Sequence, residues 1–346
     1  MNRLFHETTV PILVALVILI AGATAAVTVS AMTLEQVRER DELYCGISTE
    51  APGFSKSDSA GNWHGLNVDV CQAVAAAVLG DADKVKFVPL TEQDHVTALL
   101  TGDVDLLSMN RAWNLSYDTL IGLDFCGITY YDGQGFLVPV ALGIQSGLEL
   151  DNVSICVEPP EKNPASLHAF FTTHTLKYKI VEPGKEDSSI ASMEAGRCDV
   201  LTGDVSRLAA LRQQFTDPDQ FIILPELISR RPLGPVVRQG DDGWFNIVRW
   251  VLFGLKIAEE KGITAAAVGQ LQDSEDPEVR RILGLEGELG KGLGIADDWL
   301  LQVIRQVGNY GELFERNLGR DSDLQMDRTI NELWTRGGLH YGAALD

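Results

Sequence analysis

The sequence predicts an α/β fold with two lobes. Short apolar strands alternate with helices over residues 43–108, and the same order returns over residues 153–204. The order strand, helix, strand, helix, strand is typical of parallel sheets with right-handed crossovers. Each half of the chain therefore has a small sheet of its own. Ligand sites of such sheets lie beyond the carboxyl ends of the strands.

Apolar periodicity and turn residues define the elements of the first half. They predict strands at 43–48, 85–89 and 105–108, and helices at 68–79 and 91–101. Gly80 and Gly102 follow the two helices. Glycine is the usual residue just past a helix end because it adopts the left-handed conformation without strain.

The rest of the chain follows the same rules. The pattern predicts strands at 153–157, 178–181 and 200–202, helices at 165–173 and 188–196, and C-terminal helices at 244–258, 268–284, 296–309 and 329–337. Two stretches, 135–138 and 233–238, are predicted to cross between the halves. We therefore expect residues 32–137 and 236–346 to form lobe 1, with a helical C-terminal extension, and residues 138–235 to form lobe 2. Two lobes joined by two crossings enclose a cleft that closes on a ligand by a hinge motion.

The first 31 residues have the features of a secretory signal peptide. Arg3 precedes an apolar run over residues 10–29, and Val29-Ser30-Ala31 places small residues at the two positions that a signal peptidase requires. Cleavage after Ala31 is expected, although a segment of about 20 apolar residues is also long enough to serve as an uncleaved membrane anchor. With either outcome the rest of the chain is exported.

The composition excludes several classes of protein. Hydrophobic residues make up 45% of the chain, which is ample for packed cores and argues against a disordered protein. The chain has 49 acidic and 28 basic residues, for a net charge of −21. Nucleic acids and anionic membranes bind surfaces rich in lysine and arginine. We therefore expect neither as a partner.

Five cysteines lie in the exported part of the chain, namely Cys45, Cys71, Cys126, Cys156 and Cys198. No C-x-x-C pair suggests a zinc or redox site, and an oxidising compartment favours disulfides. We expect Cys45 to pair with Cys71 and Cys156 with Cys198, which leaves Cys126 free. The alternative is that several of these residues are buried free thiols.

Candidate binding residues follow the strands, whereas motifs for catalysis are absent. No P-loop, nucleophile elbow or metalloprotease motif occurs, and the histidines are isolated, so we expect no catalytic residue, cofactor or metal site. The loops after the strands carry aromatic, carboxylate and basic side chains, namely Phe54, Asn110, Arg111, Trp113, Tyr117, Glu161 and Asp204. Aromatic faces with a carboxylate suit a small ligand that bears a cationic amine.

Several longer motifs carry a family resemblance. The segments DVDLLS, YYDGQGFLV, GRCDVLTGD, PLGPVVRQGDDGWF and QVGNYGELFERNLG, over residues 103–319, resemble the general L-amino-acid-binding proteins of periplasmic ABC importers. The resemblance runs from about residue 33 to residue 341. It implies a type II periplasmic binding fold and a monomer that captures an amino acid in the periplasm. Such a protein delivers its ligand to an ABC permease complex in the inner membrane. The two expected disulfides also fall at cysteine positions of the family.

The resemblance assigns roles to some of the candidate residues. It implies that Asp204 receives the α-amino group of the ligand, that Phe54 stacks on the ligand and that Asn110 lines the pocket. The family's carboxylate-binding arginine, in a pattern like T-L-S-R-D, is replaced here by Tyr117. The anion-binding turn of the second lobe is replaced by Pro159-Pro160-Glu161, which removes backbone donors and adds a negative charge.

These replacements leave three hypotheses for the ligand. Arg111, six residues before Tyr117, can serve as a substitute anchor for a carboxylate. The ligand can instead be a cationic amine without the carboxylate, held by an acidic and aromatic site. Ligand binding can also be lost, so that the scaffold serves another purpose.

A solute-binding protein for an amino acid or related amine is the expected function. It captures its ligand by hinge closure and performs no covalent chemistry. The alternatives are a sensory or partner protein with altered specificity, and a dehydratase-like enzyme on the same fold, which would need Glu161 as a general acid.

Overall fold

Two five-stranded sheets organise the protein. The computed structural model describes residues 32–157, 165–181 and 188–345. The strands of the first sheet lie in the order β4 (Val85–Leu90), β1 (Leu43–Ser48), β5 (Leu106–Ser108), β14 (Val236–Arg238) and β6 (Leu123–Phe125). The strands β4, β1 and β5 are parallel, whereas β14 is antiparallel to both of its neighbours. The predicted parallel strand, helix, strand series of the first half is therefore present.

The second sheet repeats this plan. Its strands lie in the order β10 (Tyr178–Val181), β9 (Val153–Val157), β11 (Val200–Asp204), β8 (Gln134–Pro139) and β12 (Phe221–Ile223). The first three strands are parallel, and β8 is antiparallel to β11 and β12. The sheet contains all of β8, so the boundary predicted after residue 137 falls inside a strand of the second sheet.

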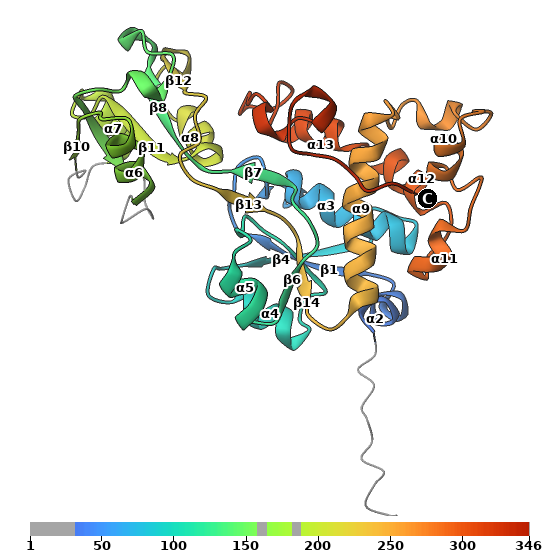
Figure 1. Cartoon of the computed structure of the whole chain (residues 1–346). Coiled ribbons are helices and arrows are strands. Elements are labelled where there is room, and N and C mark those ends of the chain that lie inside the picture. The colour runs from blue at the N-terminus through green and yellow to red at the C-terminus, as the bar shows by residue number, and fades with distance from the viewer. Residues whose placement is uncertain (1–31, 158–164, 182–187, 346) are drawn as a thin grey trace, which may run out of the picture. The chain divides into compact units, whose positions relative to one another are not determined.

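Two further strands connect the sheets. The strand β7 (Tyr130–Asp132) leads out of the first sheet, and β13 (Arg231–Leu233) leads back to it, and the two pair antiparallel (Figure 1). Arg231 lies opposite Asp132 in this pair. A small hairpin of β2 (Lys56–Ser57) and β3 (Trp63–His64) follows β1. The paired crossings β7 and β13 thus bring residues about a hundred positions apart in the chain into contact.

Helices pack on both sheets. Those that flank the strands are α2 (Thr33–Arg40), α3 (Leu66–Leu79), α4 (His95–Thr101), α5 (Leu115–Leu120), α6 (Ala165–Thr173), α7 (Ser189–Glu194) and α8 (Val205–Arg212). The C-terminal part contains α9 (Asp242–Glu260), α10 (Pro277–Ile282), α11 (Leu289–Leu293), α12 (Trp299–Gln306) and α13 (Tyr310–Asn317). Short 3-10 turns lie at Val140–Leu142, Gly147–Glu149, Pro218–Gln220, Val268–Gln270, Thr329–Asn331 and Trp334–Arg336.

Helix α9 anchors the C-terminal part to the first sheet. Trp244 is buried, and its indole nitrogen donates a hydrogen bond to the carbonyl oxygen of Asp105 at 2.9 Å. Lys256 is also buried and donates to the carbonyl oxygen of Ile128 at 2.9 Å. Burial lowers the pKa of Lys256 to about 8 because the charged form loses hydration. The helix therefore contacts the chain just before β5 and again between β6 and β7.

Some predicted elements are wrong in detail. The helix expected over 268–284 is broken into a 3-10 turn and α10, because Pro277 can begin a helix but not continue one. The helix expected over 329–337 is two isolated 3-10 turns. Helix α5 was expected to be part of a loop, but Asn114 caps it by accepting a hydrogen bond from the backbone nitrogen of Tyr117.

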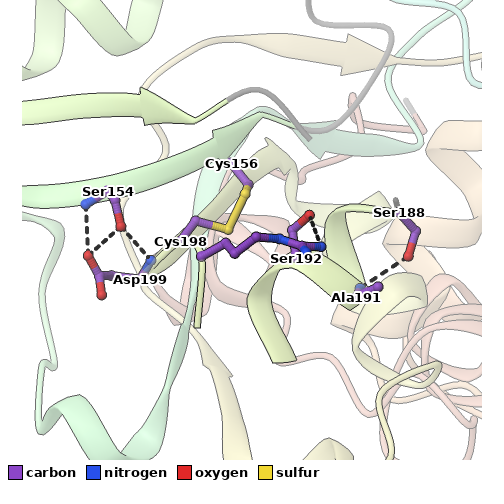
Figure 2. Close-up of a disulfide and its surroundings, with 8 residues drawn as sticks. Ser154, Cys156, Ser188, Ala191, Ser192, Cys198 and Asp199 are labelled. Carbon is purple, nitrogen blue, oxygen red and sulfur yellow. Dashed lines mark hydrogen bonds between the residues drawn. A yellow bond between two sulfur atoms is a disulfide. The ribbon is translucent and has the colours of Figure 1, made fainter. Parts of the chain in front are cut away.

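Each sheet carries one disulfide. Cys45 of β1 is joined to Cys71 of α3, and Cys156 of β9 is joined to Cys198, which precedes β11. These are the two pairs expected from the sequence, and Cys126 is a buried free thiol. Figure 2 shows the second disulfide beside Asp199, whose carboxylate accepts from the backbone nitrogen and the hydroxyl of Ser154 at 2.8 and 2.6 Å. The disulfide and the Asp199 contacts both tie the start of β11 to β9.

Candidate functional site

A cavity of about 640 Å³ lies at the carboxyl ends of strands from both sheets. Loops after β1 and β5 line it from the first sheet, and the end of β11 with α8 lines it from the second. The paired strands β7 and β13 contribute Asp132 and Arg231. Strand ends are where the fold class places a ligand. The volume is in the range of small-molecule sites.

The charged residues that line this cavity are of both signs. They are Glu50, Glu92, Arg111, Asp132, Asp204, Arg207 and Arg231. Four acids and three arginines nearly balance. Sequence reasoning overlooked Arg207 and Arg231. The cationic-amine hypothesis relied on Glu161, which lies outside the described residues.

Asp204 lies at the end of β11, as expected, and it already has a cationic neighbour. Its carboxylate oxygen Oδ2 is 2.6 Å from Nη1 of Arg231. Burial raises the pKa of Asp204, and the charges of Arg231 and Arg207 act in the opposite direction. Arg231 was missed because it is on the second crossing, far from Asp204 in sequence. No signal in the sequence marked Arg231, which lies two residues before the segment 233–238 that was expected to return to lobe 1.

Asp132 is a second carboxylate that the sequence did not single out. It is buried at the end of β7, where it accepts hydrogen bonds from the hydroxyl of Ser206 at 2.5 Å and the backbone nitrogen of Gly133 at 2.9 Å. Burial, and then the negative charge of Asp204, raise its pKa to about 6. Because Ser206 belongs to α8, this carboxylate joins the crossing strand to the second sheet's helix.

Arg111 lies in the cavity lining and is held from two sides. Its Nη1 donates to the hydroxyl oxygen of Tyr117 at 2.7 Å, and its guanidinium carbon is 4.7 Å from the centre of the Tyr117 ring. Its Nη2 is 3.3 Å from Nδ1 of His95, the first residue of α4. Tyr117 thus contacts Arg111 and does not itself line the cavity formed by the described residues.

The remaining predicted residues are placed differently from one another. Phe54 reaches the cavity lining, but it is only 2% exposed and its ring packs edge-on against Tyr130 at 5.4 Å. Asn110 also lines the cavity, and its side-chain oxygen accepts from Asn67 at 2.8 Å. Trp113 stacks on Phe125 in the core and does not line the cavity formed by the described residues. Glu161 lies outside the described residues.

A second hollow, of about 670 Å³, lies beside the β2–β3 hairpin and α13. Its buried carboxylate, Asp69, already contacts Arg316 at 2.8 Å and the side-chain nitrogen of Asn317 at 2.5 Å. No group of residues suited to binding a metal ion occurs in the described ranges. In the same ranges no helix has the length and apolar character that crossing a membrane requires.

Comparison with known proteins decides the family. The chain is 46% identical over 326 residues to the general L-amino acid-binding periplasmic protein AapJ of Rhizobium johnstonii, covering 94% of this chain and 95% of the relative. The chain belongs to the family of periplasmic amino-acid-binding proteins of ABC transporters. Another member, the glutamate/glutamine/aspartate/asparagine-binding protein BztA of Rhodobacter capsulatus, is 45% identical over 329 residues, covering 95% of this chain and 96% of the relative. No family model matches the chain.

A solved structure of the family supports the fold. It is a periplasmic binding protein of an ABC transporter from Brucella ovis with glutathione bound. It is 43% identical, with a TM-score of 0.77, and the match covers 90% of this chain and 99% of that one. The predicted family and the two-lobed type II periplasmic binding fold are thereby confirmed.

Proposed function

We propose that this family member captures a ligand with a free α-amino and α-carboxylate group in the cavity at the strand ends, with Asp204 binding the ammonium and Arg111 the carboxylate. The observation that carries the proposal is that these two opposite charges line one cavity, each on a loop or strand end of a different sheet. A zwitterion matches such a pair, whereas a ligand with positive charge alone would leave the guanidinium of Arg111 without a counter-charge.

The arrangement supports Arg111 as the substitute for the family's carboxylate-binding arginine. A guanidinium has five N–H donors and can bind a carboxylate through two of them. Asn110, beside it in the chain, adds a polar group to the lining, and Phe54 adds an apolar one. Glu161 stays a proposed contact of a larger ligand, whereas Trp113 packs on Phe125 in the core.

The names of the relatives point to the same group of atoms. AapJ is named for L-amino acids, BztA for glutamate, glutamine, aspartate and asparagine, and the Brucella ovis protein holds glutathione. All these molecules carry a free α-ammonium and α-carboxylate, in glutathione on the γ-glutamyl residue. Asp204 and Arg111 would bind this shared group, and other residues would determine which side chain of the ligand is accepted.

The proposed function also has a cellular location and a partner. We place the mature protein, residues 32–346, in the periplasm as a monomer without enzymatic activity that delivers its ligand to an ABC permease complex in the inner membrane. Residues 1–31 act as the signal peptide. The mass of the exported protein reports whether its chain begins at Met32.

A ligand panel tests the binding proposal. The purified mature protein is screened by thermal unfolding against L-amino acids, glutathione and amines without an α-carboxylate, such as putrescine. A ligand at one hundred times its Kd should add about 2.7 kcal/mol to the free energy of unfolding. We expect α-amino acids or glutathione to stabilise the protein, and putrescine to have no effect. Stabilisation by the amines alone would contradict the proposal.

Two substitutions then assign the charges. Arg111→Ala and Asp204→Asn should each weaken binding of the stabilising ligand by about tenfold to a hundredfold, because hydrogen bonds to charged groups contribute about 1.5–3 kcal/mol. Arg230→Ala is the matched control, since Arg230 is exposed, adjacent to Arg231 and not part of the cavity lining. An Arg111→Ala variant that binds like the Arg230→Ala variant would exclude Arg111 as the anchor.

A further inference from the structure

The contacts of Arg111 keep its positive charge available to a ligand in the cavity. Among the described residues Arg111 forms no ion pair, and its two side-chain partners, Tyr117 and His95, have no formal negative charge. The two contacts engage Nη1 and Nη2, one donor each. Of the five N–H groups of a guanidinium, three then remain for a ligand. Neutral partners thus fix the orientation of the side chain without neutralising it.

His95 is the buried member of this cluster. It is 2% exposed, at the start of α4, whereas Tyr117 is half-buried on α5. The 3.3 Å contact between Nη2 of Arg111 and Nδ1 of His95 is a hydrogen bond only in the neutral tautomer that carries its hydrogen on Nε2. That nitrogen is buried and has no hydrogen-bond partner among the described residues. A protonated ring would lose this acceptor and place a second positive charge against the guanidinium.

The environment of His95 keeps the ring neutral. Burial lowers its pKa, and the charge of Arg111 lowers it further, while the backbone of Thr91 and Glu92 and the carboxylate of Glu92 act in the opposite direction. Glu92 is on the exposed loop before α4 and also lines the cavity. The neutral form that Arg111 requires is therefore the form that this site favours near neutral pH.

We infer that His95 is a positioning residue that holds the guanidinium of Arg111 in the cavity lining, and thereby sets the affinity of the site for the α-carboxylate of a ligand. His95 itself does not contact the ligand. The inference rests on the proposed role of Arg111 and adds a residue to it that no sequence motif marks.

A matched pair of probes isolates the carboxylate. L-Glutamine and 4-aminobutanamide differ only by the α-carboxylate, and both are titrated calorimetrically into wild type and variants. His95→Ala should weaken L-glutamine binding by about tenfold, corresponding to about 1.4 kcal/mol. It should change the weak binding of 4-aminobutanamide by less than about twofold, since that probe makes no carboxylate contact with Arg111.

Two further variants distinguish the loss of Arg111 positioning from a nonspecific structural effect of the substitution. His95→Asn keeps an acceptor near the position of Nδ1 and should recover most of the lost L-glutamine affinity. His64→Ala is the control, because His64 is an exposed histidine on the β2–β3 hairpin and contacts Asp58 rather than Arg111. Equal loss of both probes in His95→Ala, or no rescue by His95→Asn, would overturn the inference.

The pH dependence supplies a test that does not need the alanine variant to fold. Lowering the pH below the lowered pKa of His95 protonates the ring, so wild type should lose L-glutamine affinity more steeply than His95→Asn. Asp132 and Asp204 titrate alike in both proteins and cancel in the comparison. Parallel pH profiles would overturn the inference.

The outcomes for Arg111 keep the two proposals distinct. If Arg111→Ala binds L-glutamine like wild type, the proposed anchor is wrong. If Arg111→Ala weakens binding and the His95 variants do not, Arg111 stands as the anchor and only the role of His95 fails.

Discussion

Asp132, in the cavity lining, makes the free energy of unfolding depend on pH. Its pKa in the folded protein is about 6, above the ordinary value of 3.8. The folded state therefore binds more protons than the unfolded state between these two values. Protonation of Asp132 therefore increases the protein's free energy of unfolding as the pH falls from 7 towards 4.

The free energy of unfolding of wild type and of Asp132→Asn should therefore depend differently on pH. As the pH is lowered from 7 to 5, wild type should gain free energy of unfolding relative to Asp132→Asn, which cannot titrate. Denaturant unfolding at both pH values measures this gain, and the changed hydrogen bonds of the variant cancel when each protein is compared with itself. Identical pH dependence would show that Asp132 titrates normally.

Cys126 gives a second prediction at the residue scale. Burial raises the pKa of its thiol, so the reactive thiolate is scarce in the folded protein. A thiol reagent should label no cysteine in the native protein. It should label one in denaturant and five after reduction, given two disulfides and one free thiol among five cysteines. Three thiols in denaturant without reductant would mean that one disulfide is missing.

The crossing strand β7 is held by the C-terminal segment. The side chain of Asn331, which is 2% exposed, accepts from the backbone nitrogen of Tyr131 at 2.7 Å and donates to its carbonyl oxygen at 3.0 Å. The Tyr131 hydroxyl also donates to the carbonyl oxygen of Leu339 at 3.4 Å. One asparagine therefore completes the hydrogen bonds of a strand between the two sheets.

Asn331→Ala should lower the free energy of unfolding by about 1–3 kcal/mol, because it leaves two backbone groups of Tyr131 unpaired. Denaturant unfolding measures the loss. Asn62→Ala is a suitable control, since Asn62 contacts Asp58 on an exposed hairpin. A loss no larger than that of the control would mean that water replaces Asn331.

Elements with local signals could be predicted from the sequence, and contacts between distant segments could not. The first five expected strands and helices correspond to β1, α3, β4, α4 and β5 because apolar spacing and the glycines after the helices are local features. Asp204 was identified by its place at a strand end. Arg231 and His95 escaped notice because their importance depends on partners on other elements, Asp204 and Arg111.

At the scale of the whole molecule, the excess acidity is not concentrated in the binding cavity. Arg3 and Glu7 cancel within residues 1–31, so the exported part retains the net charge of −21. The cavity itself has nearly balanced charges. Among the described residues, the excess of negative charge therefore lies mainly outside the cavity lining.

The strand order has a consequence for export. The second sheet is built entirely from residues 134–223, whereas the first sheet requires β14, which follows that whole segment in the chain. As the polypeptide emerges N-terminus first on the far side of the membrane, the second sheet has all its strands before the first sheet does. The early part of the first sheet, with α3 and its largely apolar side chains, must wait for β14 and α9 to arrive. The part of the first sheet that is synthesised first is therefore among the last parts of the fold to be completed.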